Sequence, residues 1–252
     1  DLEAFMPRWL PHYCEQASRL IEARAAFLHQ ESGFFASFLV EEGLIEEARF
    51  VPMFGIHGMA EAVNLLMDKE GLAGRYGHDE GANQLGHRIS ARLSAWVTAR
   101  PQPHAWGGRA LLHSQGGLSL DKGVTPGVRI PYGEEPDPAS HLLALAPHHG
   151  YYHSGISEIL TLDPTIRQNP QALLQLCKGA FALGMREFSA NVADSDLVRV
   201  TGYMIRKSDV ARFAAEGSRL QTTCLGAEAS ELTGIRQRAP RVLGLEASLC
   251  DY

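Results

Sequence analysis

The sequence lacks the features that would place the protein in a membrane, on nucleic acid or in a secretory compartment. No stretch approaches the roughly 20 apolar residues of a membrane-spanning helix. The net charge is −6 and no run of basic residues is present, which argues against binding nucleic acid through its phosphates. The chain also shows no signal-peptide pattern. We therefore expect a cytoplasmic protein that binds neither membranes nor nucleic acid.

Cysteine is scarce and widely spaced, at positions 14, 177, 224 and 250, without a CxxC pair. This spacing is typical neither of zinc sites nor of a disulfide framework, and it is compatible with a reducing compartment. The sequence therefore predicts no metal site. With 252 residues, 45% of them hydrophobic and 21% charged, a soluble globular protein with one large core or two smaller ones is expected.

Hydrophobic periodicity predicts several helices and short strands. Apolar residues at helical spacing predict helices over residues 12–30, from Met59 onward and over residues 82–96. Asn169 followed by Pro170 predicts the start of a helix that is apolar nearly all round and is therefore expected to be buried. A last helix is expected to begin at Lys207 or Ser208. Strands are expected at residues 50–56, 109–113, 156–162 and 187–192.

Two segments near the start of the chain contain candidate functional residues. Cys14 stands near the start of the first predicted helix, where a thiol can have a lowered pKa, but cysteine also commonly packs as a small apolar residue. His57 and Glu61 flank a glycine-containing turn from strand to helix, so they are candidates for substrate contact or proton transfer. In the alternative interpretation Glu61 favours the helix N-terminus and His57 is a partly buried histidine.

The segment from residue 101 to residue 138 is dense in glycine and proline, and such long loops are usually functional. We expect it to shape a substrate pocket, with His113, Ser114, Gln115 and Arg129 as polar candidates. It could equally be an ordered wrap over the core, with Arg129 paired to a surface acid. Four further histidines follow, and His148 and His149 among them are candidates for a pocket wall or an interface. These four are His141, His148, His149 and His153.

Residues 197–204, LVRVTGYM, place Arg199, Thr201 and Tyr203 around Gly202. Such a pattern is typical of a strand that runs into a turn. The string also resembles the signature of glycyl radical enzymes, in which a glycine near the C-terminus stores an unpaired electron on its α-carbon. Glycine suits this role because it has no Cβ, so the radical can flatten and delocalise into both peptide groups. The resemblance implies that Arg199, Thr201 and Tyr203 support the loop of Gly202.

Longer strings extend this resemblance over nearly the whole chain. The segment MREFSANVADSDLVRVTGYMIRKSDVARFAAEGSRLQTTCLG, residues 185–226, is similar to the end of the YjjI-type branch of glycyl radical enzymes. FVPMFGIHGMAEAVNLL, residues 50–66, is similar to the same branch, as are GRALLHSQGG, PYGEEPDP and APHHGYYHSGISEILTLD. The resemblance implies an α/β fold, in which this chain is the C-terminal half of a ten-stranded barrel with helices outside and the glycine loop inside.

The resemblance also implies a mechanism and partners. A separate activating enzyme, which uses S-adenosylmethionine and an iron–sulfur cluster, would install the radical on Gly202, and the chain itself would bind no cofactor. A cysteine would then abstract hydrogen from a small polar substrate. No cysteine here matches that position, so we expect it in the N-terminal half of the same protein. Because family members are often dimers, a homodimer is also expected.

Two alternatives remain open. The string at residues 50–66 also resembles, more loosely, anaerobic ribonucleotide reductases, although the four-cysteine zinc site usual in that branch is absent. The other alternative is a binding or assembly module that keeps the fold without the chemistry.

Overall fold

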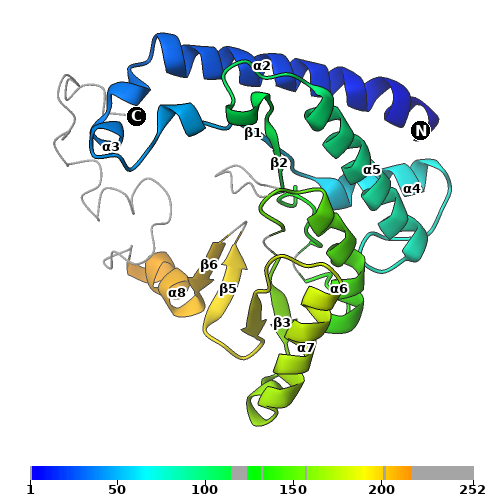
Figure 1. Ribbon diagram of the computed structural model, residues 1–252. Coiled ribbons are helices and arrows are strands. Elements are labelled where there is room, and N and C mark those ends of the chain that lie inside the picture. Colours follow the sequence, from blue (N-terminus) through cyan, green and yellow to red (C-terminus); the bar gives the residue numbers. More distant parts are fainter. Residues whose placement is uncertain (1, 115–123, 132, 157, 201–202, 217–252) are drawn as a thin grey trace. The chain divides into compact units, whose positions relative to one another are not determined.

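A computed structural model describes residues 2–114, 124–131, 133–156, 158–200 and 203–216 (Figure 1). The chain divides into two compact units, Asp1–Asp194 and Ser195–Tyr252. The first unit contains the helices α1 (Leu2–Ala4), α2 (Leu10–Gln30), α3 (Phe38–Glu41), α4 (Met59–Lys69), α5 (Glu80–Ala99), α6 (Pro138–Leu145) and α7 (Pro170–Ala182). In the second unit, the described part holds an antiparallel strand pair followed by α8 (Lys207–Glu216).

Two short parallel strand pairs lie in the first unit. β1 (Met53–Gly55) pairs with β2 (Leu111–His113), and β3 (Leu160–Leu162) pairs with β4 (Ala190–Val192). All four strands fall within the predicted stretches, but each is only three residues long. Parallel partners need long crossover connections, and here these contain helices. The fold is therefore a mixture of helices and strands, and the strands of the described residues do not join into a closed sheet.

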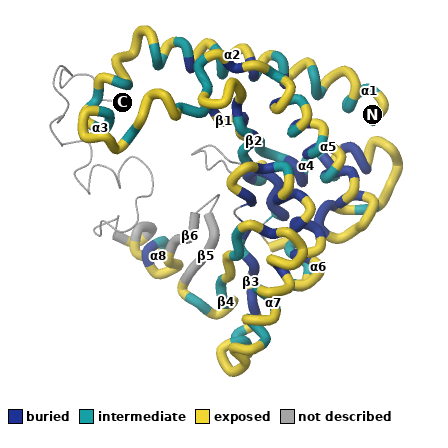
Figure 2. Tube along the Cα trace, in the orientation of Figure 1, coloured by how far each residue is buried: buried dark blue, intermediate teal, exposed yellow. Residues whose placement is uncertain are grey.

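The larger core of the first unit lies where α4 and α5 meet the β1–β2 pair, as the dark blue segments in Figure 2 show. The predicted spacing on these helices is confirmed, because Val63, Leu85, Ile89 and Leu93 are all buried. Asn83 of α5 is polar but is also buried. Its Oδ1 accepts the backbone N–H of Gly77 at 2.7 Å, which replaces the hydrogen bonds that the amide loses from water.

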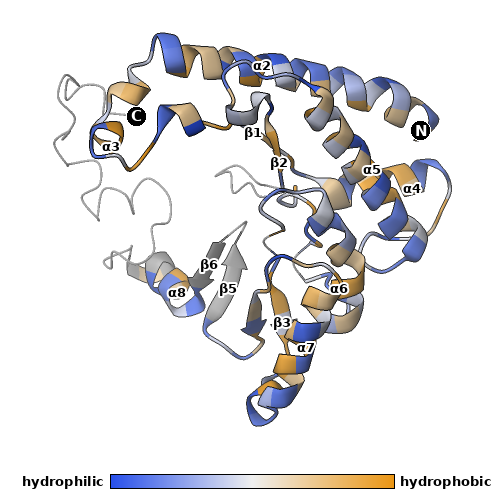
Figure 3. Cartoon of the chain, in the orientation of Figure 1, coloured by the Kyte–Doolittle hydropathy of each residue, from blue (hydrophilic) through white to orange (hydrophobic). Residues whose placement is uncertain are grey.

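A smaller core joins α6, α7 and β3. The predicted start of α7 is confirmed: the side chain of Asn169 accepts the backbone N–H of Ala172, and Pro170 occupies the first turn. The expectation that α7 is buried is wrong. α7 carries apolar residues, orange in Figure 3, but Leu174 and Phe181 are 45% and 52% exposed because within the described residues only one side of the helix meets this core.

In the N-terminal helix too, apolar spacing predicts the helix correctly but not which of its residues are buried. α2 confirms the helix predicted over residues 12–30, and Ala17 and Ile21 pack against the larger core. Leu20 and Phe27 fall at the same helical spacing as these residues but are 60% and 52% exposed. Among the described helices, none combines the length and the apolar character needed to cross a membrane.

Gly127 lets the segment after residue 123 approach the end of β2. Its φ is +59°, and a Cβ at this position would lie 1.5 Å from the carbonyl oxygen of Ser114. Its N–H donates to the carbonyl of Ile56 at 3.1 Å, and its carbonyl accepts the N–H of Met59 at 3.2 Å. The close approach therefore ties this segment to both β1 and α4.

Replacing Gly127 by alanine should lower the free energy of unfolding by about 2–4 kcal/mol, because a methyl group cannot occupy the space of a backbone carbonyl. The matched control is Gly43→Ala, at φ +68° with no atom within 4 Å of the added Cβ. That change should cost only the left-handed strain of about 1 kcal/mol. Urea unfolding of both variants would measure the difference, and equal losses would contradict the described packing.

Candidate functional site

The glycine motif lies on an antiparallel hairpin in the second unit. β5 (Leu197–Val200) and β6 (Tyr203–Arg206) pair in register, with Val200 opposite Tyr203 and Arg199 opposite Met204. The predicted strand is thus confirmed, and a second strand follows it at once. Thr201 and Gly202, the two residues between the strands, lie outside the described residues.

The base of this hairpin is connected to α8 through Asp196. Its backbone carbonyl accepts the N–H of Lys207 at 2.7 Å, and its Oδ1 accepts the N–H of Ser208 at 3.0 Å. The hydroxyl of Ser208 also donates to the carboxylate, and this bond is the largest cause of the lowered pKa of Asp196. A carboxylate beside the first turn complements the helix dipole. The predicted helix start at Lys207 is confirmed, and the contact joins the two ends of the hairpin.

In the first unit, the carboxyl ends of β1 and β2 bring together His57, Glu61 and His113, three of the candidates from the sequence. Gly55 is the register partner of His113, and His57 forms an isolated bridge with Pro126. The ends of parallel strands are a common place for ligand sites in α/β folds. Gln115, the next polar candidate, lies outside the described residues.

The side chains of Glu61 and His113 bind neighbouring segments of the chain. Glu61 Oε1 accepts both the N–H of Thr125 at 2.9 Å and the Thr125 hydroxyl, so it holds the segment that follows residue 123. His113 Nδ1 lies 3.3 Å from the hydroxyl of Ser154. Partial burial lowers the pKa of His113, which favours its neutral form. A neutral imidazole can accept a proton as a general base, whereas the carboxylate of Glu61 holds Thr125.

Arg129 is almost completely buried, at 1% exposure, so it is not on a surface wrap. Burial raises the pKa of the Glu187 carboxyl, and the positive charge of Arg129 partly opposes this rise. The next residue, Ile130, donates its N–H to Glu158 Oε2 at 3.1 Å, and His141 Nε2 lies 3.6 Å from the same oxygen. Arg129 and Glu158, which carry opposite charges, are therefore both buried in the first unit.

His148 belongs to a buried chain of hydrogen bonds whose direction is fixed. The carbonyl of Val128 can only accept, so Tyr76 donates to it at 2.7 Å. Tyr76 must then accept the Nε2–H of His148 at 3.1 Å, which leaves Nδ1 to accept the hydroxyl of Ser90 at 2.8 Å. The hydroxyl of Tyr152 completes the chain by donating to Ser90 at 2.9 Å.

This network holds His148 in the neutral state. Burial, together with the neighbouring His87 and His149, lowers its pKa well below the ordinary value, and burial raises the pKa of Tyr76 well above its own. Both ring nitrogens of His148 already have partners. The ring thus acts as part of the packed core, which sequence patterning did not indicate. The signal that could have found it is Ser90, a polar residue on the apolar face of α5 beside Ile89 and Leu93.

His149 is fully buried and points into a different environment. Its Nδ1 accepts the backbone N–H of Arg186 at 3.1 Å, so its proton is on Nε2. Burial is the main cause of its low pKa of about 4, and the nearby guanidinium of Arg186 lowers it further. A Cβ on Gly155 would lie 3.0 Å from the same Nδ1, which shows how closely the backbone encloses this ring. His148 and His149 therefore belong to two separate sets of contacts.

Cys14 is not a reactive thiol at a helix N-terminus. A π-helical turn (Phe5–Trp9) and α1 precede α2, so Cys14 lies within a continuous helical stretch and not at its start. The side chain is 4% exposed, and burial raises its pKa to about 11. This confirms the interpretation of Cys14 as a small buried residue. No group of three or more metal-binding side chains occurs in the described part of the chain.

Comparison with known proteins identifies the family of this chain. A family described as "Glycyl radical enzyme YjjI-like" matches residues 1–241. The chain therefore belongs to the YjjI-like family of glycyl radical enzymes.

Two relatives are similar over most of this chain. The uncharacterized protein YjjI of Escherichia coli (strain K12) is 59% identical over 250 residues, which cover 99% of this chain and 48% of YjjI. An uncharacterized protein of Haemophilus influenzae is 35% identical over 239 residues, which cover 92% of this chain and 46% of that protein. The chain spans about half the length of these curated relatives. No solved structure matches it.

Acidification should test the buried neutral state of His149. Its pKa is about 4 in the folded protein and near 6.5 in an unfolded chain, so the unfolded state binds more protons between these values. The free energy of unfolding should therefore fall by about 2 kcal/mol for this side chain as the pH drops from 7 to 5. In His149→Gln, which keeps an acceptor for Arg186, urea unfolding should show a smaller loss. Equal losses in both proteins would contradict the assignment.

Proposed function

We propose that this chain carries the radical-storing part of a glycyl radical enzyme and that Gly202 is the storage site. The observation that supports the proposal is the pairing of Val200 with Tyr203, the residues that flank Thr201 and Gly202 in the sequence, in a chain that belongs to this family. The α-carbon of glycine has no side chain to prevent the radical from becoming planar. Hydrogen bonds at Asp196 would keep the hairpin closed at its base.

The residues around Gly202 would hold its loop. Arg199 and Tyr203 lie on facing strands next to the loop, and Thr201 precedes the glycine directly. In the proposed reaction the activating enzyme removes one hydrogen atom from the Gly202 α-carbon. The α-carbon then takes a hydrogen atom from a cysteine thiol, which leaves a sulfur radical. That sulfur takes a hydrogen atom from a substrate C–H bond and becomes a thiol again.

The cysteine in this scheme belongs, we propose, to another part of the same protein. Cys14 is buried with a raised pKa, and Cys177 lies on α7 in the smaller core region. The curated relatives are about twice as long as this chain, which leaves room for such a segment. The parallel β1–β2 and β3–β4 pairs would be parts of one half of the ten-stranded barrel, with the helices outside.

The substrate would be a small polar molecule near the carboxyl ends of β1 and β2. His57 and His113 are the candidates that stand at these ends, and the buried cation of Arg129 follows Gly127 by two residues in the segment that contacts the end of β2. Gln115 remains a candidate from the sequence. Glu61 holds the segment at Thr125, and His148 and His149 are fully buried, so we assign these three the positioning of nearby segments.

Electron paramagnetic resonance of the full-length protein, treated anaerobically with its activating enzyme, should show a doublet. The splitting arises because the glycine α-carbon keeps one hydrogen after the other is removed. Gly202→Ala should abolish this signal. Gly179→Ala, at a helical position on α7 with no atom within 4 Å of the added Cβ, is the matched control and should keep it. Cys14→Ala should also keep it.

A silent wild-type spectrum, obtained with an activating enzyme that works on another substrate protein, would overturn the proposal. The hairpin would then be a strand and a turn in a non-catalytic binding module. A doublet that survives Gly202→Ala but disappears in Gly179→Ala would move the radical site to α7.

A further inference from the structure

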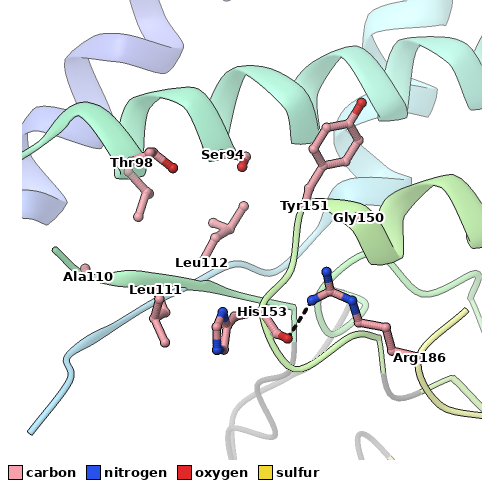
Figure 4. A pocket seen from close by; sticks show the side chains of 10 residues that line it. Ser94, Thr98, Ala110, Leu111, Leu112, Gly150, Tyr151, His153 and Arg186 are labelled. Atoms are coloured by element: carbon pink, nitrogen blue, oxygen red, sulfur yellow. Dashed lines mark hydrogen bonds between the residues drawn. The ribbon is translucent and has the colours of Figure 1, made fainter. Parts of the chain in front are cut away.

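An open pocket of about 200 Å³ lies in the first unit, beside β2 (Figure 4). Ser94 and Thr98 of α5 form one side, strand β2 forms the floor, and Tyr151 and His153 approach from the segment after α6. The side chain of Arg186 lies at the edge, and its guanidinium points toward the carbonyl of His153. The pocket thus joins hydroxyl groups, an apolar floor and one cation.

Arg186 is held in place but uses only part of its hydrogen-bonding capacity. Its Nη1 donates to the carbonyls of Tyr152 at 3.0 Å and His153 at 2.7 Å. An arginine has five N–H donors, so Nε and Nη2 keep three more, and these have no protein partner in the described part of the chain. Nε and Nη2 form the edge of the guanidinium that binds a carboxylate or phosphate through two parallel bonds.

The charges around the pocket favour an anion. None of its lining residues is an aspartate or a glutamate, although the chain as a whole has a net charge of −6. Ser94 and Thr98 lie in the C-terminal half of α5, where the helix dipole is negative and opposes anion binding. Arg186 must therefore supply most of the attraction, so its replacement should have a large effect.

We propose that this pocket binds a small oxyanion, with Nε and Nη2 of Arg186 holding its carboxylate or phosphate group. The hydroxyls of Ser94 and Thr98 line the same pocket and can donate to the ligand. Val97 and Leu112 give an apolar surface that suits the short hydrocarbon chain of a carboxylate. The volume is below the roughly 300–1,000 Å³ of pockets for drug-sized ligands, which limits the ligand to a small molecule.

The competing explanation is that Arg186 only holds the segment of Tyr152 and His153. That role needs Nη1 alone and would not depend on the charge of any ligand. The two explanations differ in what they expect of an anion and of a neutral molecule of the same shape.

The test is a calorimetric titration of the full-length, unactivated protein with butyrate at constant ionic strength. Because no radical is needed, the result is independent of the function proposed for Gly202. Butyrate should bind saturably, and butyramide, its neutral isostere, should bind at least about tenfold more weakly, as expected for hydrogen bonds to a charged group. Inorganic phosphate that displaces butyrate would point to a phosphate ester, and phosphate without effect to a carboxylate.

Arg186→Gln should weaken butyrate binding about tenfold or more. Arg88→Gln removes the same charge from an exposed position on α5 that does not line the pocket, so it should leave binding unchanged. If circular dichroism shows that Arg186→Gln is unfolded, the butyrate titration of Thr98→Val replaces it as the test. This change removes one exposed hydroxyl from the pocket and should weaken butyrate binding severalfold. Equal binding of butyrate and butyramide, no saturable binding of either anion, or equal effects of the two arginine changes would overturn the proposal.

Discussion

One backbone carbonyl, that of Val128, determines how the larger core is held together. Because it can only accept a hydrogen bond, it fixes Tyr76 as its donor, and that choice sets every following bond through His148 and Ser90 to Tyr152. The chain joins the loop before α5, the middle of α5, the segment after residue 123 and the segment after α6. Since each member is buried, the loss of any one would leave an unpaired polar group in the core.

The candidates at the carboxyl ends of β1 and β2 depend on this arrangement. Val128 immediately follows Gly127, whose contact with the end of β2 needs a residue without a Cβ. Glu61 and Gly58 bind the same segment at Thr125 from the other side. His57 and His113 therefore stand on backbone that is fixed from several directions, and Arg129, two residues after Gly127, is buried.

Much of the fold could be predicted from the sequence, because helices and caps are local. Apolar spacing located α2, α4 and α5, and Asn169 with Pro170 located the start of α7. The pairing of Phe54 with Leu112 could not be predicted, since a strand gives no sign of its partner. Nor could the exposure of Phe181, because an apolar helix face indicates only that burial is favourable. At the site, the sequence indicates His148 and His149 as candidates because histidines cluster there. Their structural roles could not be predicted, because their partners are distant in the sequence.

The hairpin of the second unit differs from the parallel pairs in contact order. Its paired residues, such as Leu197 and Arg206, are close in the sequence, as are Asp196 and Ser208 at its base. By comparison, α4 and α5 lie between β1 and β2 in the sequence, so the partners in this pair are far apart along the chain. Local contacts close with little loss of chain entropy, so the hairpin can form early and re-form quickly after opening. In the proposed function, Gly202 must meet an activating enzyme first and a cysteine afterwards. A hairpin suits this sequence of events because its two strands pair with each other and need no other segment to keep their hydrogen bonds.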